Sequence, residues 1–213
     1  MKLPAPPLLL ITDRRQAHGN IIDLAEAAFK AHCRWVSLRE KDLSETEQGE
    51  LLRALLSRAK PFQAKVTLHG DPKLARDAGA DGVHLAARGD AATARRLLGN
   101  EALIGISIHS AAEVRKIDPA FVNYVIAGPV FETASKPGYG PALGPEGLAL
   151  IVKACAVPVV AIGGITPKTI PDCLMAGASG VAVMGGVMRA ADPGKEIGNL
   201  LAAYPRPRYG ATP

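Results

Sequence analysis

The fold of this chain can be worked out from the stretch VVAIGGITP, which spans Val159–Pro167. Four apolar residues in a row are typical of a strand that is buried on both faces, as in a parallel sheet. Gly163 and Gly164 let the backbone turn, or approach a ligand, without a Cβ in the way. Thr166 and Pro167 suit the N-cap and the first position of a helix. We therefore expect a strand, a glycine turn and a helix in succession.

The same succession of strand and helix repeats along the whole chain. Strands are expected at Leu8–Ile11, Trp35–Leu38, Ala64–Leu68, Gly82–Leu85, Leu103–Ile106, Val122–Ile126, Val159–Ile162 and Gly180–Val183. Helices are expected at Ile21–Ala31, Ser44–Ala59, Pro72–Ala78, Ala91–Leu98, Ala111–Lys116, Pro145–Ala154, Pro167–Met175 and Pro193–Leu201. Ser44, with Glu47 three residues further on, has the pattern of a capping box and supports the second of these helices.

This alternation predicts an α/β protein built on one parallel sheet. A chain of 213 residues with eight such units has the size of a small (β/α)8 TIM barrel, and no boundary divides 1–213, so a single barrel domain is expected. An open, doubly wound sheet is the alternative. In a barrel the active site lies at the carboxyl ends of the strands, so the residues that follow each strand are the candidates for function.

Composition excludes several classes of function. The chain has 48% hydrophobic and only 4% aromatic residues, which predicts an aliphatic core. A net charge of +5 suits an anionic small molecule, but the basic residues are dispersed and aromatics are scarce, which argues against nucleic acid. We expect no membrane partner and a cytoplasmic location, because no apolar run spans a bilayer and no signal peptide is visible. The scattered cysteines predict buried thiols.

A second strand followed by glycines occurs at Val181–Gly186. Backbone N–H groups after the seventh and eighth strands, beside a helix N-terminus, form the phosphate site of many barrels. We therefore predict that Gly163, Gly164, Met184 and Gly185 bind a phosphate. Two tight glycine turns without a ligand are the alternative.

Polar side chains follow two further strands. Arg39 and Lys41 come after the second strand, and alternation along an extended chain places both on one side, where they suit an anionic substrate. A surface salt-bridge cluster is the alternative. The loop 128–140 is long, as lids and binding loops are, although a solvated structural loop has the same composition. Its candidate ligand-binding residues are Thr133, Ser135 and Lys136.

Three histidines, His69, His84 and His109, fall at or near strand ends. Histidine is the usual acid–base group near neutral pH, although position alone favours a structural role for each of the three. His109 lies beside Ser107 and Ser110, whose hydroxyls could orient its ring. No histidine pair has the spacing of metal ligands, so no zinc site is expected.

Six motifs in order give the chain a resemblance to a known family. They are LITD at Leu10–Asp13, LREK at Leu38–Lys41, ADGVHL at Ala80–Leu85, GISIHS at Gly105–Ser110, GPVF at Gly128–Phe131 with KPG at Lys136–Gly138, and AIGGI at Ala161–Ile165. Together they resemble the thiamine phosphate synthase/TenI family over about Leu8–Asp192. The resemblance implies a TIM barrel of thiamine biosynthesis that binds a small-molecule thiazole phosphate and self-associates as a homo-oligomer.

The family contains two activities. The synthase, a transferase, joins a pyrimidine diphosphate to a thiazole phosphate, with Mg²⁺ on the diphosphate. Thiazole tautomerase (TenI), an isomerase, moves a proton on a thiazole carboxylate phosphate and needs no metal. The synthase pattern holds its metal with one aspartate after strand three and one after strand four. Gly70 and Gly89 stand in those places here, and Ser37 replaces a glutamine of the synthase pattern.

These departures predict a metal-independent thiazole tautomerase without a cofactor, because Mg²⁺ is bound mainly through carboxylates and substrate phosphates. The resemblance implies that His109 shuttles the proton, with His69 as the second candidate and Ser107 at the ligand. Asp71 and Asp90 each lie one residue later and could rescue a metal site. Two alternatives remain: a thiamine-phosphate synthase (thiamine-phosphate diphosphorylase) with Mg²⁺, and a barrel that binds a thiazole phosphate without catalysis.

Overall fold

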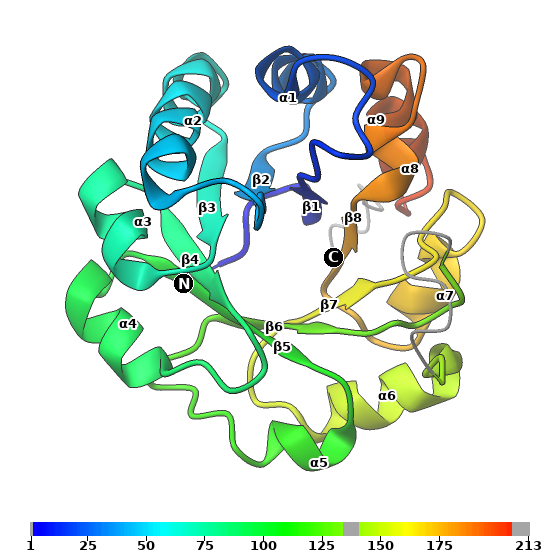
Figure 1. Ribbon diagram of the computed structural model, residues 1–213. Coiled ribbons are helices and arrows are strands. Elements are labelled where there is room, and N and C mark those ends of the chain that lie inside the picture. The colour runs from blue at the N-terminus through cyan, green and yellow to red at the C-terminus, as the bar shows by residue number, and fades with distance from the viewer. Residues whose placement is uncertain (1, 134–140, 206–213) are drawn as a thin grey trace, which may run out of the picture.

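The computed structural model describes residues 2–133 and 141–205. Its strands form one closed parallel barrel in chain order, with the helices around the outside (Figure 1). The strands are β1 Leu8–Ile11, β2 Trp35–Leu38, β3 Lys65–His69, β4 Gly82–Leu85, β5 Leu103–Ile108, β6 Tyr124–Ala127, β7 Val159–Ile162 and β8 Gly180–Val183.

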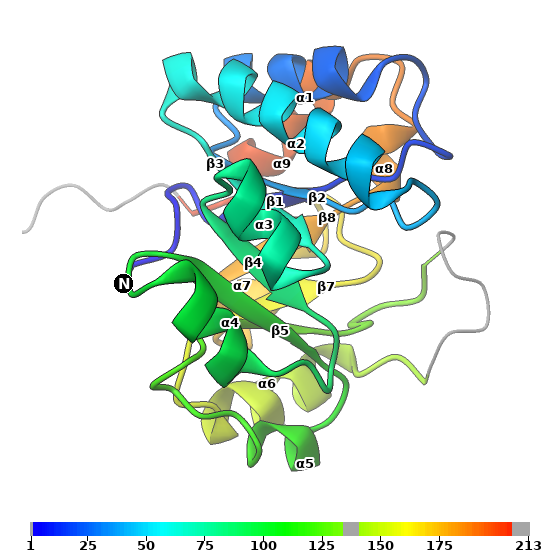
Figure 2. The same cartoon turned by 60° about the vertical axis from the view of Figure 1, so that its left-hand side comes forward.

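The helices follow the strands in turn. They are α1 Ile21–Lys30, α2 Glu45–Ala59 with the short 3₁₀ helix η1 Lys60–Phe62, α3 Pro72–Ala78, α4 Ala91–Leu98, α5 Ala111–Val114, α6 Gly144–Ala154, α7 Ile170–Met175, α8 Gly185–Met188 and α9 Pro193–Ala202. Figure 2 shows α1, α2 and α9 together on one side of the strands and α5 and α6 on the opposite side. None of the described helices has the length and apolar character that crossing a membrane requires.

The first and last strands pair with each other, which confirms the TIM barrel and excludes an open sheet. Leu10 of β1 is in register with Val36 of β2, and Leu8 of β1 with Val181 of β8. Every residue of β1 is buried, because one face packs inside the barrel and the other packs against helices. That double burial explains why the strands appear in the sequence as continuous apolar runs.

The barrel interior combines large rings with glycines that make room for them. Trp35 and Tyr124 are fully buried there, with ring centroids 4.7 Å apart and an interplanar angle of 79°. A Cβ on Gly105 would lie 2.1 Å from the Tyr124 ring, so the neighbouring strand must carry glycine at that position. The interior is therefore a packed core that closes the bottom of any ligand site at the mouth.

Side chains that cap the helices account for several acidic residues after the strands. Ser44 and Glu47 form the predicted capping box at α2. Asp71 caps α3, where its Oδ1 accepts the Lys73 N–H at 2.7 Å, and Asp90 caps α4 through its bond with the N–H of Thr93. These carboxylates therefore satisfy helix N-termini.

Several local elements differ from the expected ones. The helix after β7 begins at Ile170 and not at Pro167, because Thr169 Oγ1 accepts the Thr166 N–H at 2.9 Å and donates to the Gly164 carbonyl at 3.1 Å, which holds 166–169 as a turn. The short helix α8 was not expected at all. In addition, β5 runs on to Ile108, and so includes Ser107.

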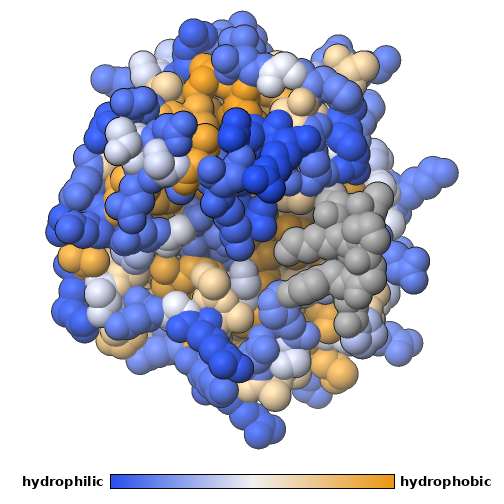
Figure 3. All heavy atoms as spheres, in the orientation of Figure 1, coloured by the Kyte–Doolittle hydropathy of each residue, from blue (hydrophilic) through white to orange (hydrophobic). Residues whose placement is uncertain are grey.

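The three cysteines are free thiols, as expected. Cys33 and Cys173 are buried, whereas Cys155 is only half-buried. Burial raises the pKa of the Cys33 and Cys173 thiols to about 11, so both are protonated at neutral pH. The face of the molecule seen in Figure 3 is mostly hydrophilic, with apolar residues between the polar ones and toward its centre.

Candidate active site

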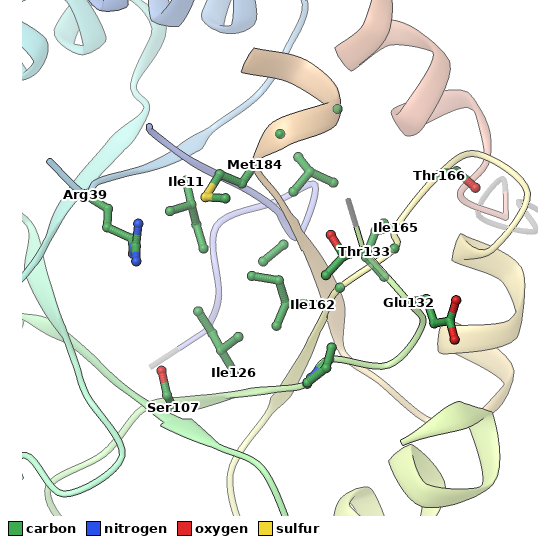
Figure 4. A pocket seen from close by; sticks show the side chains of 18 of the residues that line it. Ile11, Arg39, Ser107, Ile126, Glu132, Thr133, Ile162, Ile165, Thr166 and Met184 are labelled. Carbon is green, nitrogen blue, oxygen red and sulfur yellow. The ribbon is translucent and has the colours of Figure 1, made fainter. Parts of the chain in front are cut away.

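A cavity of about 290 Å³ lies at the carboxyl ends of the strands. Its walls come from the ends of β1, β2, β3, β5, β6, β7 and β8 and from the loops that follow them. Figure 4 shows Arg39 and Ser107 on one side of it, Glu132, Thr133, Ile165 and Thr166 on the other, and Ile11, Ile126, Ile162 and Met184 between. An apolar floor with polar groups at both sides is typical of a site for a small molecule that carries charged ends.

The structure brings the two predicted glycine pairs to one side of this cavity. Gly163 and Gly164 follow β7 with φ angles of +99° and +64°, which is the left-handed region that favours glycine. A Cβ would lie 2.7 Å from the Pro129 Cα at the first position and 2.6 Å from the Glu132 carbonyl oxygen at the second. These glycines are therefore required for the contact between the loops after β6 and β7, and they also line the cavity.

Met184 and Gly185, after β8, border the same cavity as the β7 glycines, as predicted. Gly185 begins α8, and the first N–H groups of a helix have no partner within it. The first amides of α8 therefore lie beside the glycines after β7 at this cavity.

Of the two predicted cations after β2, the structure brings Arg39 to the cavity but leaves Lys41 outside it. Arg39 is half-buried, and its backbone N–H donates to Thr12 Oγ1 at 2.9 Å. Lys41 is exposed and does not line the cavity. The alternation we assumed fails because β2 ends at Leu38, so residues 39–41 are no longer in an extended strand.

Two charged residues of the cavity were missed by the sequence analysis. Arg189 lines it from the C-terminal end of α8, and its guanidinium donates to Gln16 Oε1. Glu132 lines it from the loop after β6. Predicting α8 would have found Arg189, since the first turn after a barrel strand points to the mouth.

The predicted residues of the loop after β6 are only partly described. Thr133 lines the cavity. Ser135 and Lys136 lie outside the described residues, so their predicted contact with a ligand is untested.

His109 borders the cavity with its ring in a defined orientation. Its Nδ1 lies 2.7 Å from the Gly128 carbonyl oxygen, which can only accept a hydrogen bond, so Nδ1 carries the hydrogen. The His109 backbone N–H donates to Glu113 Oε2 at 2.7 Å. In the neutral ring Nε2 is therefore the basic nitrogen, which is suited to accepting a proton. A backbone carbonyl 19 residues away, rather than a neighbouring hydroxyl, supplies this contact.

The other two candidate histidines, His69 and His84, lie next to each other, one at the cavity and one beneath it. His69 ends β3 and lines the cavity, and its ring centroid is 4.8 Å from that of His84. His84 is only 1% exposed, and its Nε2 lies 2.9 Å from Ser107 Oγ, which lines the cavity. Burial, and to a lesser degree the nearby His69, lower the pKa of His84 well below its ordinary value, so that ring is neutral.

The aspartates that could have rescued a metal site do not reach the cavity. Asp71 and Asp90 cap helices and do not line the cavity, and Asp13 Oδ2 accepts the Gln16 side-chain N–H at 2.6 Å. Among the residues that the structure describes, no cluster of three or more His, Cys, Asp or Glu side chains could hold a metal ion. Glu132 is the single carboxylate among the described lining residues, so a Mg²⁺ at this cavity would take most of its oxygen ligands from substrate phosphates and water.

Comparison with known proteins places this site in a family. The family model for thiamine monophosphate synthase (TMP-TENI) matches residues 8–187. A putative thiamine-phosphate synthase of Geobacter sulfurreducens is 40% identical over 200 residues, which cover 93% of this chain and 94% of that protein. A thiamine-phosphate synthase of a Roseiflexus species is 34% identical over 86% of this chain and 79% of that protein.

A solved structure agrees with these relatives. Thiamine phosphate pyrophosphorylase from Pyrococcus furiosus superimposes with a TM-score of 0.81 at 28% identity, over 92% of this chain and 94% of that one. The motifs, the barrel and the matches all point the same way: the chain belongs to the thiamine monophosphate synthase family and is an enzyme of thiamine biosynthesis.

Proposed function

We propose that this chain acts as a thiamine-phosphate synthase, which joins a hydroxymethylpyrimidine diphosphate to a thiazole phosphate and releases pyrophosphate. The observation that carries the proposal is the near full-length similarity to relatives named for that activity, one of them 40% identical over 93% of this chain. Those names favour the synthase over the thiazole tautomerase that we expected from the departures in the sequence motifs.

The two sides of the cavity support a reaction between two phosphorylated ligands. We assign the thiazole phosphate to the glycine backbone after β7 and β8, where N–H groups and close approach are available. We assign the diphosphate to the opposite side, where the Arg39 guanidinium can donate two parallel hydrogen bonds to phosphate oxygens. The isoleucines Ile11, Ile126 and Ile162 lie between and offer an apolar surface to the two rings.

In this reaction the bond between the pyrimidine methylene carbon and the diphosphate oxygen breaks, and a bond from that carbon to the thiazole nitrogen forms. The electron pair of the broken bond leaves with pyrophosphate, so negative charge grows on the side of the cavity assigned to Arg39. A fixed cation there stabilises that charge, and holding both rings on one apolar floor aligns the reacting atoms. Among the described residues, charge stabilisation is assigned to Arg39 and the backbone amides.

A second candidate function is supported by a specific observation, the orientation of His109. Its Nδ1–H is held by the Gly128 carbonyl, so in the neutral ring Nε2 is the nitrogen that can accept a proton. One well-placed base with electrostatic support is enough to move a proton on a thiazole carboxylate phosphate, as a tautomerase does. His69 lines the same cavity and is the second proton carrier in this scheme.

Two assays on the same preparation distinguish these functions. The first supplies both phosphorylated substrates with Mg²⁺ and measures pyrophosphate, and the second supplies a thiazole carboxylate phosphate in D₂O and measures proton exchange by NMR. Pyrophosphate release supports the synthase. Proton exchange without pyrophosphate release overturns it in favour of the tautomerase, and in that case His109→Ala should abolish exchange while ligand affinity stays nearly unchanged. Binding of thiazole phosphate without either reaction identifies a non-catalytic barrel.

A further inference from the structure

A buried histidine and a serine at the cavity form a pair that the proposed reaction does not use. His84 lies on β4, and its Nε2 is 2.9 Å from Oγ of Ser107 on the neighbouring strand β5. Only Ser107 of the two lines the cavity. His84 therefore lies directly behind a hydroxyl that a ligand would meet.

The surroundings of His84 keep its ring neutral and fix its position. His69 faces it from β3 with ring centroids 4.8 Å apart, and Tyr124 faces it from β6 at 5.6 Å. Ser107 and Gly105 face it from β5. None of these groups carries a full negative charge that would favour an imidazolium, and burial opposes one. A neutral imidazole has one N–H and one acceptor nitrogen, so its tautomer decides what Ser107 can do.

The geometry around the second ring nitrogen selects the tautomer. His84 Nδ1 is buried and has no hydrogen-bond partner among the described residues. A buried N–H without an acceptor is rarer in proteins, and more costly, than an acceptor nitrogen without a donor. The hydrogen therefore belongs on Nε2, where it is donated to Ser107 Oγ. Because the serine oxygen then accepts from His84, the serine hydrogen is left to point elsewhere, toward the cavity.

We propose that His84 is a positioning residue that holds Ser107 as a hydrogen-bond donor to the anionic ligand of the cavity. Ser107 lies on the same side of the cavity as Arg39, and both line it (Figure 4). We assign the Ser107 O–H to the ligand that is placed on that side. This inference rests on the proposed function in one respect, the binding of a phosphorylated ligand on that side. The tautomer itself does not depend on any ligand.

Nitrogen NMR of the wild-type chain tests the tautomer. In protein labelled with ¹⁵N at its five histidines, the spectrum of His84 should show a protonated Nε2 and an unprotonated Nδ1 at neutral pH. The signals are assigned by their loss in His84→Gln. A protonated Nδ1 with a bare Nε2 would overturn the proposal, because Ser107 would then donate to His84 and not to a ligand.

Binding of inorganic pyrophosphate, measured by calorimetry, tests the function of the pair. His84→Met removes the donor at nearly constant size, whereas His84→Gln keeps an N–H at the same reach. His84→Met and Ser107→Ala should each weaken binding about tenfold, the usual effect of losing one hydrogen bond to a charged group. His84→Gln should bind nearly as well as wild type, and the double variant His84→Met/Ser107→Ala no worse than Ser107→Ala alone.

The outcomes separate failure of this inference from failure of the proposed function. A folded His84→Met that binds pyrophosphate as tightly as wild type, or a double variant whose losses add, overturns the positioning role. If His84→Met does not fold, the nitrogen spectrum of the wild-type chain and the comparison of His84→Gln with Ser107→Ala still decide. A wild-type chain that binds no pyrophosphate overturns the assignment of the diphosphate, while the tautomer is judged by NMR alone.

Discussion

The two sides of the cavity are built in different ways. On the side of β7 and β8, glycines form much of the wall, and the backbone of Gly163 and Gly164 is held by contacts with the loop after β6 that leave no room for a Cβ. On the side of β2 to β5, the wall consists of side chains such as Arg39, His69 and Ser107 at or near strand ends. The part of the glycine wall after β7 therefore cannot change without disturbing the contact between the loops after β6 and β7, whereas the side-chain wall can change its chemistry and keep the fold.

The largest effect is expected in the glycine wall. Gly164→Ala forces a φ of +64° on a residue with a side chain and places its Cβ 2.6 Å from the Glu132 carbonyl oxygen. The free energy of unfolding, measured by urea titration, should fall by about 2 kcal/mol or more, and phosphate binding should fall with it.

A glycine elsewhere provides the control for that substitution. Gly198 lies in α9, and a Cβ there would meet nothing within 4 Å. Gly198→Ala should raise the free energy of unfolding by about 0.5–1 kcal/mol, since alanine favours a helix. Equal stability of Gly164→Ala and wild type would show that the glycine wall is not constrained as described.

The side-chain wall should respond in the opposite way, with lost binding and little lost stability. Arg39→Gln removes the cation assigned to the diphosphate and should weaken pyrophosphate binding about tenfold or more. Lys41→Gln makes the same change of charge two residues away, outside the cavity, and should have little effect. Calorimetric titration of both variants measures the difference, and equal losses would mean that only net charge matters.

The buried histidine behind the side-chain wall, His84, should make the stability of the fold sensitive to acid. The pKa of folded His84 lies well below its ordinary value of 6.5, so below pH 6.5 the unfolded chain binds a proton that the folded chain does not. Its contribution to stability is complete above pH 6.5 and is lost as the pH falls toward the folded pKa, by about 1.4 kcal/mol per pH unit.

The matched variant isolates this titration from those of the other histidines. In His84→Gln the free energy of unfolding should decline less steeply between pH 6.5 and pH 5 than in wild type. Urea titrations at several pH values provide the slopes. Identical slopes in the two proteins would show that His84 is not held neutral by the fold.

The smallest effects on ligand binding are expected at Asp71 and Asp90, which belong to neither wall of the cavity. Asp71→Ala and Asp90→Ala should each lower the free energy of unfolding by about 1 kcal/mol, because each removes the N-cap of a helix. Pyrophosphate affinity in the presence of Mg²⁺ should not change. A loss of Mg²⁺-dependent affinity in either variant would return that residue to a metal site.

The strands were predictable from the sequence because they are buried on both faces. The bounds of β1, β2, β4, β7 and β8 agree with the expected ranges. β1 and β7 are continuous apolar runs that end at Thr12 and Gly163, and the other three strands are short, mostly apolar runs. Helix starts were less predictable where two caps compete. Thr166–Pro167 has the local pattern of a helix start, but the Thr166 N–H donates to Thr169 Oγ1, and α7 begins only at Ile170.

The sequence predicted those site residues whose place directly after a strand puts them at the mouth of the barrel. It did not predict side-chain orientations that depend on contacts with residues far away in the chain. The glycine pairs and the histidines after the strands were found because position after a barrel strand implies the mouth. The ring of His109 is oriented by the Gly128 carbonyl, and Arg189 contacts Gln16 across 173 residues of chain. Such long-range contacts depend on how the loops pack, which no local pattern contains.

The most direct test of the proposed activity is the release of pyrophosphate by the purified chain when both phosphorylated substrates are supplied. We predict stoichiometric formation of pyrophosphate and thiamine phosphate, and a strong reduction of both in Arg39→Gln. Proton exchange on the thiazole with no pyrophosphate formed, at any Mg²⁺ concentration, would contradict the synthase and leave the tautomerase as the function of this cavity.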